Sequence, residues 1–439
     1  MSLKKLSGAP ARYVALLALA ATPAGLSATA AVAQSPFDSC AAEAASQWEP
    51  GFEAVGKDTF RINAAAAIAA CKAALAADPG NAQLKAWLAR AYYADAQTAL
   101  AVPLFEEAVA ANNNVALSLY GDMLISADGV AQDMARGADL LRIAAEAGFA
   151  PAQNSYGLSF DFGEGVEQDY SQAARWYRAA AEQGLPRGQT NLGLMYQEGL
   201  GLDRDYVAAA AWLQRAADNG DSRGQYNLGK IYEQGHMVPV DYARAAGLYQ
   251  QASDAGDMYA QTSLGYLYEM GLGVTADIDK AATLYRQAAD QGYAQAEHNV
   301  GVLYEDGRGL PQDFKQAFDW YTKAANNGNL DAAVNLGLLY FNGTGTTVDN
   351  SQGVYWTRVA ADGGNSVGLN NMGHVYEHGL GVDANRDTAL SYYQQSADLG
   401  YQLGLDNLTR LQGQAAPTVQ PEPEPVPEPQ PTRRDKLKN

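Results

Sequence analysis

The pattern of hydrophobic and polar positions over residues 113–400 repeats every 36 residues. In each copy an apolar stripe with helical spacing surrounds one glycine, as Leu192 and Tyr196 surround Gly193. A glycine inside a helix costs about 1 kcal/mol relative to alanine. Because this glycine returns in eight copies without an insertion, we interpret it as the point where a neighbouring helix approaches the backbone. The eight residues are Gly121, Gly157, Gly193, Gly229, Gly265, Gly301, Gly337 and Gly373.

Each copy predicts two helices, and positions are numbered here from its mid-helix glycine. The apolar stripe predicts an amphipathic first helix, which glycines at positions +6 and +8, such as Gly199 and Gly201, end. At position +12 an acidic or amide residue such as Asp205 predicts the N-cap of a second helix. In that helix bulky residues alternate with alanines such as Ala209, which favours interlocked helices. A further glycine, such as Gly220, ends it.

The pattern A-x-x-x-L-G-x-x-Y-x-x-G-x-G-V-x-x-D-x-x-x-A-x-x-W-Y-x-x-A-A-x-x-G closely resembles the Sel1-like repeat, a relative of the tetratricopeptide repeat. The resemblance covers about two thirds of the chain. It implies an all-α fold, a right-handed α-solenoid superhelix of antiparallel helix hairpins with a concave binding face. Three copies depart most from the pattern: the first has Leu124 in place of the tyrosine, the seventh has Gly353, and the eighth has Tyr392–Tyr393.

The flanking segments predict further parts of the chain. Residues 34–112 resemble tetratricopeptide units with less regular spacing, and we expect this helical region to cap the array. Residues 401–413 predict a C-terminal capping helix. In residues 414–439 prolines recur at every second position before a basic end, which predicts an extended, disordered tail.

The first 33 residues have the three parts of a secretory signal peptide. A positively charged start is followed by a short apolar stretch and by the A-x-A cleavage site of residues 31–33. A membrane anchor is the alternative, but Pro23 and Gly25 interrupt the apolar run. We therefore predict an exported protein, periplasmic or secreted, with no membrane insertion.

Cys40 and Cys71 are the two cysteines of the chain. In an oxidising compartment they are expected to form a disulfide; two separate buried thiols are the alternative.

The chain is acidic, with a net charge of −19 at pH 7. Loss of Lys4, Lys5 and Arg12 with the signal peptide would lower this to −22. Binding to phosphates requires a basic surface, so the charge argues against nucleic acid and anionic membranes as partners. A neutral or basic partner is favoured.

The sequence offers little support for catalysis. The G-x-G loops join two helices and do not follow a strand, so they are not phosphate-binding loops. The stretch His374 to His378, HVYEH, matches a zinc-protease pattern, and a histidine pair at this spacing can hold zinc. However, each of its residues occupies an ordinary repeat position, and Glu377 is the equivalent of Glu233. We predict a non-enzyme without a cofactor or metal, and a metal-dependent hydrolase is the least favoured alternative.

Binding is the remaining function. By resemblance to tetratricopeptide repeats, positions −3, +1 and +4 of the first helices should line the concave face, and the regularly recurring asparagines at −2 should instead hydrogen-bond the turn of an adjacent unit. Apolar anchors beside a row of acids suit a protein or peptide segment with apolar and basic side chains. The predicted function is a scaffold or adaptor for protein–protein interaction in the cell envelope. A cell-wall or exopolysaccharide binder is the alternative, and the same residues could also simply solvate the surface. The predicted binding residues are Leu194, Tyr226, Lys230, Glu233, Tyr266, Glu269, His298, Val302, Glu305, Leu338 and Phe341.

Overall fold

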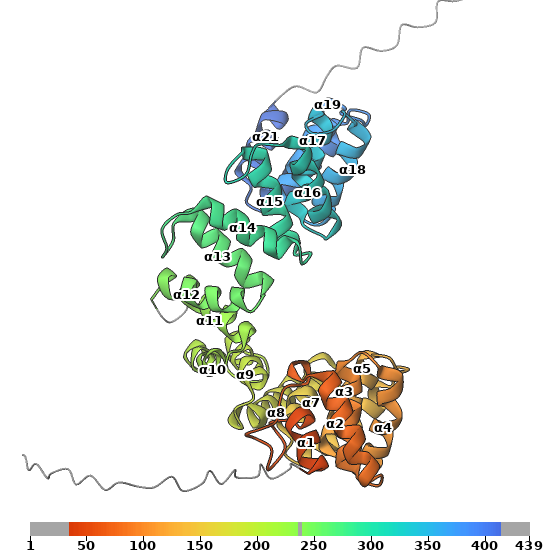
Figure 1. Ribbon diagram of the computed structural model, residues 1–439. Helices are drawn as coiled ribbons and strands as arrows, with labels where there is room; N and C mark the ends of the chain where they lie inside the picture. The colour runs from red at the N-terminus through yellow and green to blue at the C-terminus, as the bar shows by residue number, and fades with distance from the viewer. Residues whose placement is uncertain (1–34, 236–238, 414–439) are drawn as a thin grey trace, which may run out of the picture. The chain divides into compact units, whose positions relative to one another are not determined.

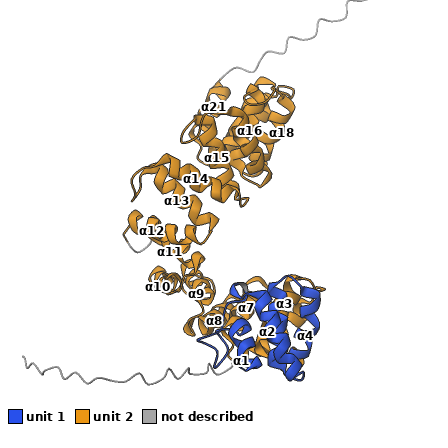
Figure 2. Ribbon diagram, in the orientation of Figure 1, with its two compact units in different colours: residues 1–108 blue, residues 109–439 orange. Residues whose placement is uncertain are grey.

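The structure is a computed structural model that describes residues 35–235 and 239–413 (Figure 1). Within these ranges it is all-helical, with twenty-one α-helices and one 3-10 turn. The chain divides into two compact units, residues 1–108 and 109–439 (Figure 2). The predicted signal peptide and the predicted disordered tail lie outside the described residues. No helix in the described ranges is both long enough and apolar enough to span a bilayer.

The first unit is held together by a disulfide and by a buried arginine. Cys40 in α1 is bonded to Cys71 in α2, which confirms the predicted pair. Arg90 in α3 is only 2% exposed, and its guanidinium donates hydrogen bonds to the carbonyl of Ala44 and to the hydroxyl of Thr59. These contacts fix the segment between the first two helices. The elements are α1 (Pro36–Ala44), a 3-10 turn (Thr59–Arg61), α2 (Ala64–Ala77), α3 (Ala82–Ala94) and α4 (Thr98–Ala110), the last of which crosses the unit boundary.

The second unit is a series of helix hairpins in which each helix contacts the next along the chain. The first helices are α5 (Asn114–Ser126), α7 (Ala150–Phe162), α9 (Pro186–Glu198), α11 (Ser222–Gln234), α13 (Met258–Met270), α15 (Ala294–Asp306), α17 (Leu330–Asn342) and α19 (Ser366–His378). The second helices are α6 (Met134–Glu146), α8 (Tyr170–Glu182), α10 (Tyr206–Asp218), α12 (Tyr242–Asp254), α14 (Ile278–Ala289), α16 (Phe314–Asn326), α18 (Asn350–Asp362) and α20 (Arg386–Asp398). Helix α21 (Gln402–Gly413) follows.

The helix boundaries fall where the pattern predicts them. The side chain of Asp205 accepts hydrogen bonds from the backbone N–H groups of Val207 and Ala208 at the start of α10. Gly199 ends α9 with a φ of 72°, a left-handed conformation that glycine adopts without strain.

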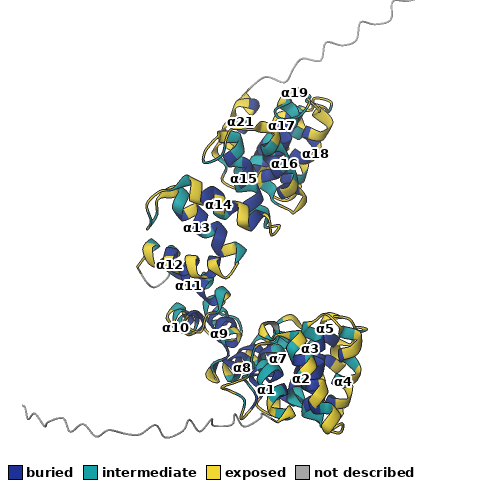
Figure 3. Ribbon diagram, viewed as in Figure 1, coloured by how far each residue is buried: buried dark blue, intermediate teal, exposed yellow. Residues whose placement is uncertain are grey.

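The core of each hairpin lies where its two helices meet, and the mid-helix glycine makes this contact possible (Figure 3). A Cβ atom on Gly265 would lie 2.8 Å from the ring of Tyr285, a residue that is buried in α14. The prediction that these glycines are close-packing points is confirmed. Helix α21 continues the 36-residue register as an incomplete ninth first helix, because its buried Leu408 and Leu411 are equivalent to Met372 and Val375 of α19.

Candidate partner-binding face

The candidate face consists of positions −3, +1 and +4 on the first helices α9 to α17. At position +4 the acids do not simply project into solvent. In five hairpins a tyrosine at position +20 on the second helix donates its hydroxyl to the acid at +4. These pairs are Tyr177–Asp161 (2.9 Å), Tyr249–Glu233 (2.5 Å), Tyr285–Glu269 (2.9 Å), Tyr321–Glu305 (2.6 Å) and Tyr393–Glu377 (2.8 Å). The tyrosine rings are buried, so each carboxylate is held by a hydroxyl that comes from the core of its hairpin.

The pair also changes the acid–base properties of its members. Burial, followed by the charge of Glu269, raises the pKa of Tyr285. The phenol therefore stays neutral and donates to the carboxylate at ordinary pH.

Three hairpins lack the acid, and each of them also lacks the tyrosine. In these hairpins position +4 is Ile125, Gln197 or Phe341, and position +20 is Leu141, Leu213 or Thr357. The Oε1 atom of Gln197 is buried and has no hydrogen-bond partner in the described part of the chain. Where a bulky apolar residue occupies +4, the helix opposite has a glycine: a Cβ on Gly353 would lie 2.7 Å from the ring of Phe341. Phe341 therefore packs against the second helix of its own hairpin.

Position +1 carries the most accessible side chains of the candidate face. Tyr266 is 45% exposed and Leu338 is 43% exposed. Leu194 and Val302 are half-buried. Lys230 is also half-buried, with its Nζ atom 5.8 Å from the centre of the Tyr226 ring.

Position −3 is mostly covered. The ring of His298 lies 5.6 Å from that of Tyr321, and burial lowers the pKa of this histidine. Tyr226 lies 5.8 Å from the rings of both Tyr249 and Tyr259. The two predicted binding residues at this position therefore contribute part of their surface to the packing between helices.

Three of the asparagines at position −2 connect successive first helices, whereas Asn227 donates to the carbonyl of Arg223 in its own helix. The amide of Asn191 donates to Asn154 at 2.9 Å, and that of Asn407 donates to Asn370 at 2.9 Å. Asn335 makes the equivalent contact with His298 at 3.3 Å. The acceptor is thus a side chain at −3 of the preceding repeat, whereas the sequence led us to expect its turn.

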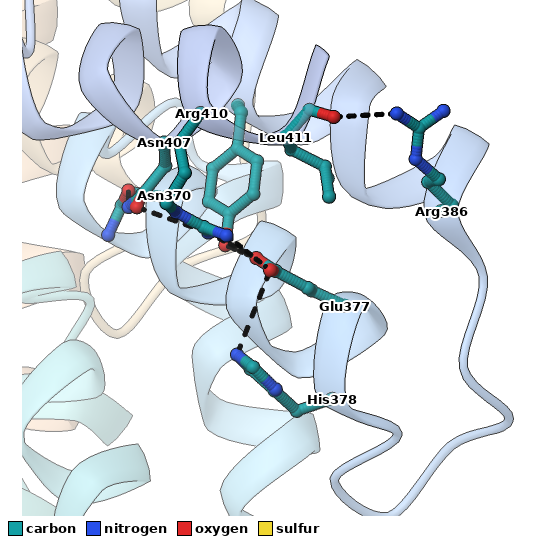
Figure 4. A network of polar contacts seen from close by, with 8 residues as sticks. Asn370, Glu377, His378, Arg386, Asn407, Arg410 and Leu411 are labelled. Atoms are coloured by element: carbon teal, nitrogen blue, oxygen red, sulfur yellow. Dashed lines mark hydrogen bonds and ion pairs between the residues drawn. The ribbon is translucent and has the colours of Figure 1, made fainter. Parts of the chain in front are cut away.

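Two of the acids at +4 are also bound by an arginine from the following repeat. Arg308 donates to Glu269 at 2.9 Å. Arg410 in α21 makes two hydrogen bonds of 2.7 Å to the two oxygens of Glu377 (Figure 4). The hydrogen bonds from Arg410 lower the pKa of Glu377 to about 2.

The histidine pair of the HVYEH stretch lies in a different setting from the one its pattern suggests. The rings of His374 and His378 are 4.2 Å apart, but the carboxylate of the intervening Glu377 is engaged by Tyr393 and Arg410. Residues 35–235 and 239–413 contain no group of three histidine, cysteine or acidic side chains placed to hold a metal ion.

Comparison with known proteins agrees with this architecture. The family model described as the Sel1 repeat matches eight segments, residues 109–149, 150–185, 186–221, 222–257, 259–293, 294–329, 330–365 and 366–401. A Sel1 repeat protein from Oxalobacter formigenes has a similar structure, with a TM-score of 0.52 and 28% identity over 71% of this chain and 90% of that one. A protective antigen of uropathogenic Escherichia coli that displays an SLR fold has a TM-score of 0.48 and 28% identity over 83% and 85% of the two chains. No curated protein matches at a significant level.

The hairpins, their close-packing glycines and the ladder of contacts between consecutive helices define an α-solenoid, a class of helical-repeat scaffold. The chain belongs to the Sel1 repeat family.

Sequence reasoning identified the acids at +4 but missed what holds them. The signal was present within the chain, because an acid at +4 occurs in the five hairpins that have a tyrosine at +20 and in none of the other three. Such coupled changes between repeats indicate a direct contact.

Proposed function

We propose that this protein is an exported, non-catalytic adaptor of the cell envelope that binds a segment of a partner protein along the candidate face. The observation that carries the proposal is the placement of Tyr266 and Leu338, two large apolar side chains exposed at position +1. Each lies on a face that also presents carboxylates fixed by buried tyrosines. Large anchors beside preordered charges favour binding, because little side-chain entropy is lost.

The charge and the compartment support the same proposal. A net charge of −19 favours a neutral to basic partner segment over an acidic one. The sequence of residues 1–33 supports export, and the Cys40–Cys71 disulfide is of the kind that persists in an oxidising compartment.

The proposal is tested by affinity purification of the tagged chain from its native envelope. The variant Tyr266→Ser/Leu338→Ser should lose the partner that the unmodified chain retains. Tyr355→Ser is the matched control, because Tyr355 is an aromatic residue at least as exposed, at 55%, and lies on a second helix, away from the candidate face. Equal recovery of the partner by all three proteins would refute the proposed face.

A glycan is the second candidate ligand, favoured by three neighbouring tyrosines. Tyr259 is 42% exposed, and the centre of its ring lies 5.8 Å from that of Tyr226 and 5.0 Å from that of Tyr293. Aromatic rings at this exposure can stack on sugar rings. Co-sedimentation with purified peptidoglycan that is lost in Tyr259→Ser, with the partner protein still retained, would favour the glycan.

A further inference from the structure

The four glutamates among the five acids at position +4 are of two kinds, closed and open. Glu269 and Glu377 are closed, because each binds a tyrosine hydroxyl and an arginine of the following repeat. Glu233 and Glu305 are open: each binds the tyrosine hydroxyl through Oε2, and no arginine or lysine of the described chain forms an ion pair with either carboxylate.

The closed pairs show what these carboxylates bind. Arg410 occupies position +1 of the incomplete ninth repeat and binds the +4 carboxylate of the eighth through both oxygens. A paired contact of this kind is the geometry in which a guanidinium best matches a carboxylate. The tyrosine leaves room for the guanidinium, because Tyr393 and Arg410 bind Glu377 at the same time.

The residue at the equivalent position above each open acid carries no charge. In the register that places Arg410 over Glu377, Tyr266 belongs over Glu233 and Leu338 belongs over Glu305. Neither side chain can neutralise a carboxylate, and both are exposed. The nearby Lys230 lies over the ring of Tyr226 and does not pair with Glu233.

Asp161 in the second repeat also binds only a tyrosine hydroxyl, that of Tyr177, and forms no ion pair in the described chain. In the same register Leu194 belongs over Asp161, and Leu194 is half-buried, whereas Tyr266 and Leu338 are exposed. The combination of an open acid with an exposed side chain above it therefore occurs at Glu233 and Glu305.

We infer that Glu233 and Glu305 are two guanidinium-binding subsites for a partner segment that carries two arginines, with Tyr266 and Leu338 covering the aliphatic part of each arginine. The inference rests on the proposed function and specifies its ligand. The two subsites are two repeats apart, with the closed Glu269 between them. At roughly 10 Å per repeat this is about 20 Å, which an extended chain spans in about six residues.

The inference is tested by fluorescence anisotropy, which measures how tightly labelled peptides bind the purified chain. Each peptide consists of alanine and leucine and carries two arginines, which are separated by one to ten residues. The unmodified chain should bind tightest at a separation of about six residues. Glu233→Gln and Glu305→Gln keep an oxygen for the tyrosine hydroxyl and should each weaken binding about tenfold. Glu269→Gln is the matched control and should leave the affinity within twofold, because Arg308 already neutralises that carboxylate.

Opening the closed site gives the sharper test. Arg308→Gln frees Glu269 and should add binding of peptides whose arginines are about three residues apart, a separation that the unmodified chain binds poorly. The inference would be overturned if the affinity were the same at all separations. It would also be overturned if Glu233→Gln, Glu269→Gln and Glu305→Gln all bound the peptides with the same affinity. The proposed function would survive that result if Tyr266→Ser/Leu338→Ser still loses the native partner, so the two failures are distinguishable.

Discussion

The ring of Tyr285 lies directly against the backbone of Gly265, so close that a Cβ atom on the glycine would be 2.8 Å from it. The first and second helices of the hairpin approach each other at this point, and the tyrosine then reaches Glu269 with its hydroxyl. The same tyrosine thus packs the two helices together through its ring and holds an acid of the candidate face through its hydroxyl.

We predict that Gly265→Ala destabilises the protein even though alanine is the better helix former. Overpacking against a buried ring costs about 1–3 kcal/mol, which exceeds the gain of about 1 kcal/mol in helix propensity. Gly247→Ala is the control: Gly247 is exposed within α12, and its added Cβ would meet nothing within 4 Å. Chemical denaturation should show a loss for the first variant and a gain of up to about 1 kcal/mol for the second. The same sign for both would contradict the packing role.

The fold could be predicted from the sequence because every repeat shows the same pattern. Eight copies of one glycine, each in an apolar stripe, specify a helix pair that no single copy would establish. The N-cap at Asp205 and the helix end at Gly199 follow from local chemistry alone, since each residue satisfies or ends its own helix.

The environment of the candidate site could not be predicted in the same way. Glu305 has the sequence features of a solvated acid, and the contact with Tyr321 is visible only by comparing position +4 with position +20 across copies. Arg308 and Arg410 occupy positions whose residue type varies from copy to copy, so the distinction between closed and open acids required the structure.

The tyrosine hydroxyls should stabilise open and closed acids to different extents. Tyr321→Phe leaves Glu305 without its hydroxyl donor, at a cost of about 2 kcal/mol for a hydrogen bond to a charged acceptor. Tyr285→Phe should cost about 1 kcal/mol, because Arg308 still binds Glu269. Denaturation of both variants measures the difference. In a double-mutant cycle, Tyr321→Phe should cost little once Glu305→Ala has removed the acceptor; a full cost in that background would assign the effect to ring packing.

The buried oxygen of Gln197 offers a place to improve the scaffold. Leu213 stands where five other hairpins have a tyrosine, and the Oε1 atom of Gln197 lacks a partner in the described residues. We expect Leu213→Tyr to supply that hydrogen bond and to stabilise the protein by about 1 kcal/mol. Leu213→Phe adds the ring without the hydroxyl and serves as the control. A tyrosine variant no more stable than the phenylalanine variant would exclude the hydrogen bond as the cause.

The disulfide should be important for the stability of the first unit. It joins residues 31 apart, Cys40 and Cys71, and on the chain-entropy model a loop of this size contributes about 3–4 kcal/mol. The double variant Cys40→Ser/Cys71→Ser should therefore expose the first unit to proteolysis at a lower denaturant concentration than the repeats of the second unit. Cleavage of both units at an unchanged concentration would show that Arg90 and its backbone partners suffice without the bond.

Acid should weaken the docking of α21 through one ion pair. The hydrogen bonds from Arg410 hold the pKa of Glu377 at about 2, below its ordinary value of 4.5. A lowered pKa in the folded state means that the stabilisation is present above about pH 4.5 and is lost as the pH falls toward 2. The difference in melting temperature between the unmodified chain and Arg410→Met should therefore be largest at pH 7 and should shrink between pH 5 and pH 2. Asn407→Ala is the matched control, because Asn407 joins α21 to α19 through the side-chain oxygen of Asn370, an acceptor that does not titrate (Figure 4). If the two variants showed the same dependence on pH, the ion pair between Arg410 and Glu377 would not be what the acid removes.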